Sequence, residues 1–196
     1  MEKQSRRQAY AEETREAILE TSHRLFSRLL FSGTTLEAIA EQSRVTKGAV
    51  YHHFKDKRAV FSACLERQAK QVSGVMAAVP QQDDVWAYAF AQCRAFLDFI
   101  VAHGKYTISL QQAITVLGWE AWRAIDSHYT LGHIERIVAR LQDSGRMKLY
   151  SRELVVNMIY GLLVNAAMNL SSLPNIDQTY QDLDEMVQDM LNGLRI

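Results

Sequence analysis

Proline, cysteine and glycine are scarce in this chain of 196 residues, which contains two prolines, two cysteines and nine glycines. Proline breaks helices because it lacks an amide donor, and here Pro80 and Pro174 both stand between long segments of helical periodicity. Cys64 and Cys93 share no close spacing with each other or with a histidine pair, which excludes a zinc knuckle and a disulfide framework. We therefore expect an all-α protein in a reducing compartment, the cytoplasm.

A net charge and long apolar runs are also missing. Lys+Arg and Asp+Glu both number 22, and a net charge of zero argues against indiscriminate nucleic-acid binding. The distribution is uneven, because residues 1–70 hold 13 basic and 9 acidic side chains and the remainder holds 9 and 13. The N-terminal part is thus the end expected to face phosphates. Since no apolar leader is present and no segment approaches a membrane span, we expect a soluble protein with no membrane partner.

The spacing of apolar residues predicts a series of helices. With 48% hydrophobic residues the chain can bury a sizeable core, and the first predicted helix covers residues 10–30. Thr34 followed by Glu37 has the signature of a capping box, which predicts that a short second helix starts there. Thr46 and Asp56 are N-cap candidates for a short third and a long fourth helix. The apolar spacing predicts further helices along the rest of the chain, about nine in all.

The second and third predicted helices have the composition of a helix-turn-helix. That motif needs a small residue where two short helices cross and apolar residues that lock their angle. Ala40 is the crossing residue, since a larger side chain would push the helices apart. The locking residues are Leu36, Ile39, Val45, Val50 and Phe54, and the opposite face of the third helix presents Lys47, Gly48, Ala49, Tyr51, His52 and His53.

Three residues of that face suit the edges of bases. The major groove of DNA admits one α-helix and offers base-edge acceptors and thymine methyl groups. Lys47 can reach guanine or a phosphate, and Ala49 can touch a thymine methyl group. Gly48 has no side chain, so the helix backbone can come close to the DNA. We therefore take residues 46–54 as a recognition helix.

Other groups suit the phosphate backbone. Tyr51 and His52 can donate hydrogen bonds to phosphates and set the register on the duplex. Backbone amides at the helix starts near Thr35 and Lys57 add phosphate sites. The alternative is a pair of core helices with a solvated polar face, but so aromatic an exposed patch favours a binding surface.

A longer string of residues resembles the DNA-binding domain of the tetracycline-repressor (TetR) family. It covers about residues 10–61 and comprises Thr14-Arg15, Ile18-Leu19, Leu25-Phe26, Thr34-Thr35, Ile39-Ala40, Val45 to Phe54, and Lys57. The resemblance implies a three-helix DNA-binding domain over residues 1–57, a helical ligand-binding and dimerisation domain over residues 58–196, and a homodimer that reads a palindromic operator. It also implies that DNA is touched by Thr46, Lys47, Gly48, Ala49, Tyr51, His52 and Lys57.

Two positions depart from the family pattern. Leu30 and Arg44 stand where the family usually has glycine. A left-handed residue other than glycine costs on the order of 1 kcal/mol, so the fold should survive with an altered loop geometry. We also count Arg44 as a candidate DNA contact.

The resemblance implies a small-molecule site in the C-terminal domain, filled by an apolar or aromatic effector. The candidates form an aromatic-rich set with a few polar tips, namely Phe96, Phe99, Ile100, His103, Tyr106, Trp119, Trp122, Tyr129 and Asn165. Aromatic side chains at such spacing also commonly form a core, and both interpretations stay open. No cofactor is expected.

The resemblance further implies that the last two helices dimerise. The apolar and small residues expected there are Gly161, Ala166, Leu170, Leu183, Val187, Met190 and Leu194. The alternative, that both helices only complete the monomer core, stays open. Asn157, Asn165 and Asn169 share one helix face, and they either bond across the interface or line the ligand cavity.

Catalysis and metal binding are not expected. His103, His128 and His133 with Cys93 are the only candidate cluster, yet His128 and His133 lie five residues apart and so face different sides of a helix. No nucleophile elbow, phosphate loop or paired-carboxylate motif is present. A second alternative is a helical adaptor that keeps this fold and has lost DNA binding.

Overall fold

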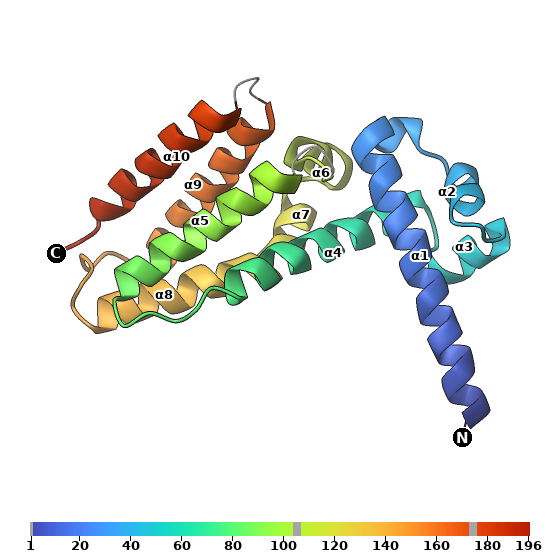
Figure 1. Cartoon of the computed structure of the whole chain (residues 1–196), viewed down its shortest axis with the longest axis horizontal. Helices are drawn as coiled ribbons and strands as arrows, with labels where there is room; N and C mark the ends of the chain where they lie inside the picture. Colours follow the sequence, from blue (N-terminus) through green and yellow to red (C-terminus); the bar gives the residue numbers. More distant parts are fainter. Residues whose placement is uncertain (1, 104–106, 173–175) are drawn as a thin grey trace. The chain divides into compact units, whose positions relative to one another are not determined.

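The computed structural model describes residues 2–103, 107–172 and 176–196, which are almost entirely helical, as predicted (Figure 1). An isolated β-bridge between Met147 and Arg195 is the only β contact given for those residues. The elements are α1 (Glu2–Gly33), α2 (Leu36–Gln42), α3 (Lys47–His53), α4 (Lys57–Ala77), α5 (Val85–His103), α6 (Leu110–Leu117), α7 (Trp119–Asp126), the π-helical turn η2 (Ser127–Leu131), α8 (Gly132–Asp143), α9 (Arg152–Ser172) and α10 (Ile176–Asn192).

Two compact units make up the chain, and the first contains the described residues 2–68 and 107–122. The short helices α2 and α3 pack side by side against α1 (Figure 1). The first part of α4 and the helix α6 complete this unit. Its core is fully buried, with 0% exposure at Ile18, Phe26, Ile39, Val50 and Phe61.

Hydrogen bonds between distant residues explain why the segment 107–122 belongs to the first unit. The Gln68 amide nitrogen donates to the Ile108 carbonyl at 3.1 Å, and the Gln68 amide oxygen accepts from the Ile108 amide at 3.0 Å. Gln112 donates to the Phe26 carbonyl at 3.2 Å, and Arg58 donates to the Leu117 carbonyl at 3.1 Å. The compact units therefore do not divide at residue 57, where we placed the domain boundary.

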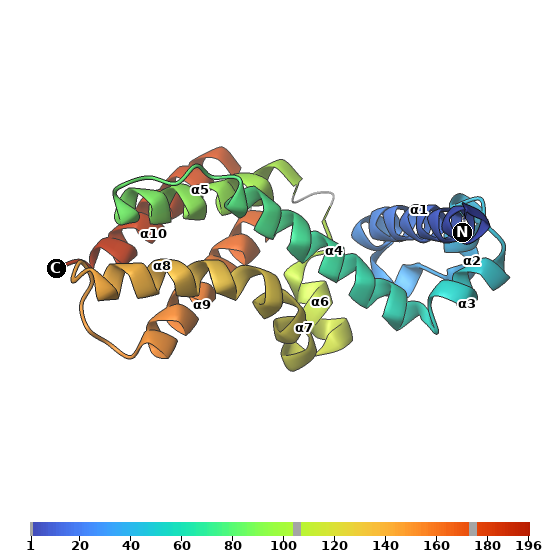
Figure 2. The ribbon, with the colours of Figure 1, turned by 90° about the horizontal axis from the view of Figure 1, so that it is seen from below.

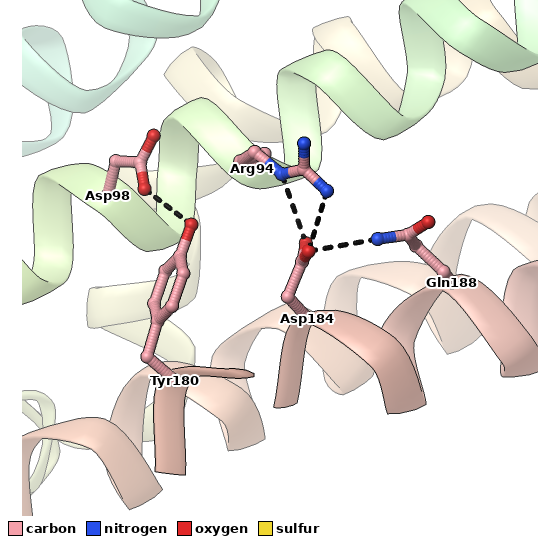
Figure 3. A network of polar contacts seen from close by, with 5 residues as sticks. All are labelled: Arg94, Asp98, Tyr180, Asp184 and Gln188. Atoms are coloured by element: carbon pink, nitrogen blue, oxygen red, sulfur yellow. Dashed lines mark hydrogen bonds and ion pairs between the residues drawn. The ribbon is translucent and has the colours of Figure 1, made fainter. Parts of the chain in front are cut away.

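The second unit contains the described residues 69–103, 123–172 and 176–196. Its long helices α5, α8, α9 and α10 form a bundle (Figure 2). A polar network joins α10 to α5 (Figure 3). In it Arg94 Nη2 lies 2.7 Å from Asp184 Oδ2, and the Tyr180 hydroxyl donates to Asp98. These bonds fix the register of α10 along α5.

Two helices of this bundle correct our expectation about membrane spans. Val85–His103 and Arg152–Leu170 are each 19 residues long with a mean hydropathy of 1.3, so by length and composition alone both could cross a membrane. The expectation that no segment approaches such a span was wrong on that test. Inside the unit, α5 and α9 pack against each other and against α8 and α10. Their apolar character therefore suits the core helices of a bundle.

Both cysteines are buried. Burial raises the pKa of the Cys64 thiol and of the Cys93 thiol to about 12. Cys64 Sγ also lies 3.6 Å from the Leu19 carbonyl oxygen, to which it donates. Neither thiol is therefore ionised at neutral pH.

Leu30 interrupts the helical geometry near the end of α1. Its φ of 61° and ψ of 171° fall in a region that glycine enters readily and other residues enter at a cost of about 1–3 kcal/mol. We expect Leu30→Gly to raise the free energy of unfolding by about 1 kcal/mol, because the relieved strain exceeds the added chain entropy of glycine. Urea unfolding followed by circular dichroism measures this change.

The neighbouring Leu29 supplies a matched control. Leu29 and Leu30 are similarly exposed, at 51% and 53%, but Leu29 has ordinary helical geometry. Leu29→Gly should therefore lower the free energy of unfolding by about 1 kcal/mol. Equal destabilisation by the two variants would show that Leu30 is unstrained.

Candidate nucleic-acid interface

The predicted helix-turn-helix is present, with α2 and α3 locked together by buried apolar side chains. Ile39, Ala40 and Val50 are at most 5% exposed. Thr46 caps α3, since its hydroxyl oxygen accepts from the Ala49 amide at 3.1 Å. The apolar contacts and the cap together hold α3 in one orientation on α2.

The turn between α2 and α3 keeps its standard form although Arg44 replaces the usual glycine. Arg44 itself takes the left-handed conformation, with φ at 58°. The Val45 amide donates to the Ala40 carbonyl at 3.0 Å, and the Arg44 amide donates to the Glu41 carbonyl at 3.1 Å. These two bonds are those of a Schellman motif. The altered loop geometry that we expected here is therefore not observed, and the exposed Arg44 side chain projects from this turn.

The outer face of α3 is exposed, as predicted, but one of its groups already has a partner. Tyr51 is 49% exposed, and His52 and Gly48 are exposed as well. Lys47 forms an ion pair with Glu37 of α2, and its ammonium nitrogen lies 5.9 Å from the centre of the Tyr51 ring. The hydrogen bond from Lys47 lowers the pKa of Glu37, and the same bond raises the pKa of Lys47.

Sequence reasoning missed Glu37 as a member of this surface. It assigned the Glu37 carboxylate to a capping box with Thr34, whereas the carboxylate pairs with Lys47. The actual cap of α2 is Thr35, whose hydroxyl oxygen accepts from the Ala38 amide at 3.1 Å. Thr34 is buried, and its hydroxyl donates to the Leu30 carbonyl at 2.9 Å. The predicted helix start was thus wrong by one residue.

His53 lies behind the exposed face. Its ring centre is 5.3 Å from that of His52 and 6.4 Å from that of Phe54. Burial, with smaller contributions from His52 and Arg15, lowers the pKa of His53. His53 is therefore neutral at neutral pH and adds no charge to the surface of α3.

Lys57 makes structural contacts with Phe31 and Thr34 that the sequence did not indicate. Its ammonium group donates to the carbonyls of Phe31 and Thr34, each at 2.8 Å, and lies 4.2 Å from the centre of the Phe31 ring. Asp56 caps α4 as predicted, because its carboxylate accepts from the Ala59 amide at 2.7 Å. Two of the three Lys57 donors thus tie the start of α4 to the end of α1.

The predicted ligand-binding residues are divided between the two compact units. Trp119 and Trp122 belong to the first unit, where their ring centres lie 5.2 Å apart. Tyr106 lies outside the described residues. His103 stacks on the buried Phe99 ring at 4.5 Å. The members in the second unit are Phe96, Phe99, Ile100, His103, Tyr129 and Asn165.

An apolar cavity of about 30 Å³ lies elsewhere in the second unit, and none of the predicted ligand-binding residues lines it. Gln92 is one of the lining residues, and its amide oxygen is buried and has no hydrogen-bond partner among the described residues. The amide nitrogen of the same side chain donates to the Met76 carbonyl at 3.1 Å. The lining residues are Met76, Trp86, Ala89, Gln92, Cys93, Ile134, Ile137, Val138, Leu141, Met147, Ile159, Leu163 and Leu191.

The residues predicted for a dimer interface fall into two groups. Ala166, Leu170 and Val187 are at most 4% exposed, so they pack in the core of the single chain and their assignment to an interface was wrong. Gly161 and Met190 are exposed, and Leu183 and Leu194 are half-buried. The apolar stripe on α10 thus packs into the core along one edge and is exposed to solvent along the other.

Large apolar side chains continue the exposed edge, and Met190 is one of the predicted interface residues. On α9 they are Leu154, Met158 and Met168, at 59%, 67% and 37% exposure, and on α10 they are Met186 and Met190, at 50% and 54%. Asn165 is exposed on the same face of α9 and accepts a bond from Asn169 at 2.9 Å. Asn157 instead accepts from Arg123 at 2.6 Å. Neither Asn157 nor Asn165 lines the apolar cavity.

The three histidines considered for metal binding contact different groups. His103 stacks on Phe99, His128 lies against Tyr129, and His133 lies 3.0 Å from the Ser73 hydroxyl. Within the described parts of the chain, no group of three His, Cys, Asp or Glu side chains is placed to hold a metal ion.

Comparisons with known proteins point to one family. Residues 18–64 match the family described as "Bacterial regulatory proteins, tetR family", and residues 86–194 match "Tetracyclin repressor-like, C-terminal domain". The transposon Tn10 TetC protein of Escherichia coli is 24% identical over 176 residues, which are 90% of this chain and 89% of that protein. The transcriptional regulator AcrR of Shigella flexneri is 50% identical over 56 residues, which are 29% of this chain and 26% of AcrR. The crystal structure of a TetR-family regulator from Pectobacterium atrosepticum is similar with a TM-score of 0.77 and 25% identity, covering 96% of this chain and 97% of the other.

Proposed function

Because the chain belongs to the tetracycline-repressor family of transcriptional regulators, we propose that it is a cytoplasmic repressor that binds a palindromic operator as a homodimer. We further propose that a small effector releases it from DNA. The observation that carries the proposal is the exposed face of α3, where Lys47, Tyr51 and His52 stand on a rigid helix-turn-helix. A regulator of this kind needs no catalytic residues.

Contacts to DNA are assigned by chemistry and position. Lys47, Gly48 and Ala49 occupy the first turn of α3, the part of a recognition helix that reaches base edges. Tyr51 and His52 follow on the exposed side and suit phosphates. Thr35, Arg44 and Thr46 stand at the start of α2, at the turn and at the start of α3. Lys57 contributes mainly by fixing α4, with one donor left for a phosphate.

Operator binding by the unmodified protein tests the proposal. A labelled fragment from the DNA beside its own gene should bind tightly, with a footprint over an inverted repeat and two chains per repeat. The affinity should fall on the order of 10³-fold between about 50 and about 200 mM salt, because phosphate contacts release counterions. Binding no tighter than to a scrambled fragment would contradict the proposal and favour the adaptor that has lost DNA binding.

The proposed dimer surface consists of exposed residues on α9 and α10. Leu154, Met158, Gly161, Asn165 and Met168 recur at intervals of four and three residues along α9, which places them on one face. Met186 and Met190 add the neighbouring face of α10. So much exposed apolar area is uncommon on a monomer. We propose that two copies pair these faces in a four-helix arrangement across a two-fold axis.

Charge placed on this surface should dissociate the dimer. We expect Met158→Glu combined with Met190→Glu to weaken dimerisation by at least about 100-fold, since carboxylates would be buried without partners. Light scattering after gel filtration measures the mass. Val75→Glu, at a 37% exposed position on α4, is the control and should remain dimeric. A double variant that is still a dimer would place the interface elsewhere.

The cavity of the second unit is the proposed effector site. Its volume of about 30 Å³ is far below the 300–1,000 Å³ typical of ligand pockets, so an effector must open it. The apolar lining suits an apolar or aromatic effector. A ligand that prefers the opened state would shift the protein toward it and thereby change DNA binding.

A further inference from the structure

A groove in the first unit, separate from the proposed effector cavity, has the size and charge of a ligand site. It has a volume of about 580 Å³, within the range of small-molecule pockets. The end of α1, the start of α4 and the helix α6 form it, and all of its lining residues belong to the first unit. The lining residues are Leu30, Phe31, Ser32, Arg58, Ser109, Gln111, Gln112, Thr115 and Val116.

The electrostatics of the groove favour an anion. Arg58 is the only charged residue that lines it among those the structure describes, and its side chain is exposed there. One of its nitrogens donates to the Leu117 carbonyl at 3.1 Å, and a guanidinium group has five N–H donors in all. Arg58 can therefore bind a carboxylate in the bidentate manner.

The remaining lining divides into an apolar and a polar part. Leu30, Phe31 and Val116 supply apolar surface, whereas Ser109, Gln111 and Thr115 supply hydroxyl and amide groups. The Leu30 side chain lines the groove from a backbone in the left-handed region. Gln112 also lines the groove, and its amide nitrogen donates to the Phe26 carbonyl. The lining thus fits a molecule with an anionic head and an apolar body.

We infer that this groove binds a small organic carboxylate, with Arg58 on the carboxylate and Leu30, Phe31 and Val116 around its apolar body. The site belongs to the DNA-reading unit and is distinct from the cavity of the second unit. Its occupancy does not depend on the protein's being a repressor.

Titration calorimetry of the full chain with octanoate and 1-naphthoate tests the inference, and octanamide and 1-naphthamide serve as neutral counterparts. At least one of the two carboxylates should bind, and should bind at least about tenfold more tightly than its amide, since the charge-assisted bonds to Arg58 are lost with the amide. Equal affinity for acid and amide, or binding of neither carboxylate, would overturn the inference.

Variants locate the binding. Arg58→Gln should weaken carboxylate binding at least about tenfold, and Arg58→Lys should recover part of it. Arg28→Gln removes the same charge from an exposed position outside the groove and should have no effect. Thr115→Trp should block acids and amides alike, because it fills the groove from an exposed position on α6. Carboxylate binding that survives both Arg58→Gln and Thr115→Trp would place the site elsewhere, and circular dichroism confirms that each variant is folded.

Discussion

Lys47→Ala combined with Tyr51→Ala is expected to weaken operator binding by at least roughly 30-fold, because base and phosphate contacts on α3 are worth about 1–3 kcal/mol each. The two side chains are adjacent on the exposed face, with the Lys47 ammonium 5.9 Å from the Tyr51 ring centre. Their removal leaves the buried residues of the helix-turn-helix untouched. Fluorescence anisotropy with the footprinted operator fragment measures the loss.

A matched pair of substitutions separates this effect from a general loss of charge. Lys70→Ala with Tyr150→Ala removes the same two residue types from exposed positions in the second unit. This control should bind the operator with unchanged affinity. If the α3 variant also binds normally, α3 is not the recognition helix.

The ion pair between Glu37 and Lys47 also affects how α3 would bind DNA. In the free protein the exposed Lys47 ammonium pairs with the Glu37 carboxylate, and lysine keeps further N–H donors for a base or a phosphate. Glu37 therefore offsets part of the positive charge that α3 would offer to DNA in non-specific binding.

Gln68→Leu is expected to lower the free energy of unfolding by roughly 2–4 kcal/mol, since it removes three hydrogen bonds in a partly buried place. Two of these bonds join Gln68 to the backbone of Ile108, which is 1% exposed. The third joins it to His23 of α1, whose Nε2 donates to the Gln68 oxygen at 3.0 Å. The substituted leucine leaves the buried Ile108 backbone without these partners.

Denaturant unfolding measures this change, and Gln71→Leu on the same helix is the control. Gln71 is exposed, so its substitution should alter stability by less than about 0.5 kcal/mol. Equal stability of the two variants would mean that the Gln68 bonds contribute nothing net. In that case apolar contacts alone would hold the segment 107–122 to the first unit.

Local signals in the sequence predicted most of the DNA-binding part of the fold. Thr46 and Asp56 cap the helices that they were expected to cap, and Ala40 is buried as the helix-turn-helix pattern requires. The capping-box pattern favoured Thr34, whereas Thr35 is an equally good cap by residue type. The choice depends on long-range contacts, since Lys57 binds the Thr34 carbonyl.

Long-range contacts also explain where prediction failed. Nothing local in the sequence shows that Gln112 bonds to Phe26, 86 residues away, so the membership of α6 in the first unit could not be foreseen. Aromatic spacing likewise did not reveal that Trp122 and Phe99 belong to different units. On α10 the apolar stripe was recognised, but only the packed structure shows that Val187 is buried and Met190 exposed.

The two buried cysteines make the protein convenient for chemical labelling. Because burial raises the pKa of both thiols to about 12, neither should react appreciably with maleimides while the chain is folded. A cysteine introduced at an exposed site such as Tyr10 or Leu149 would react far faster. Fluorophores placed in each unit of the otherwise natural chain could then report the distance between the units, with and without DNA.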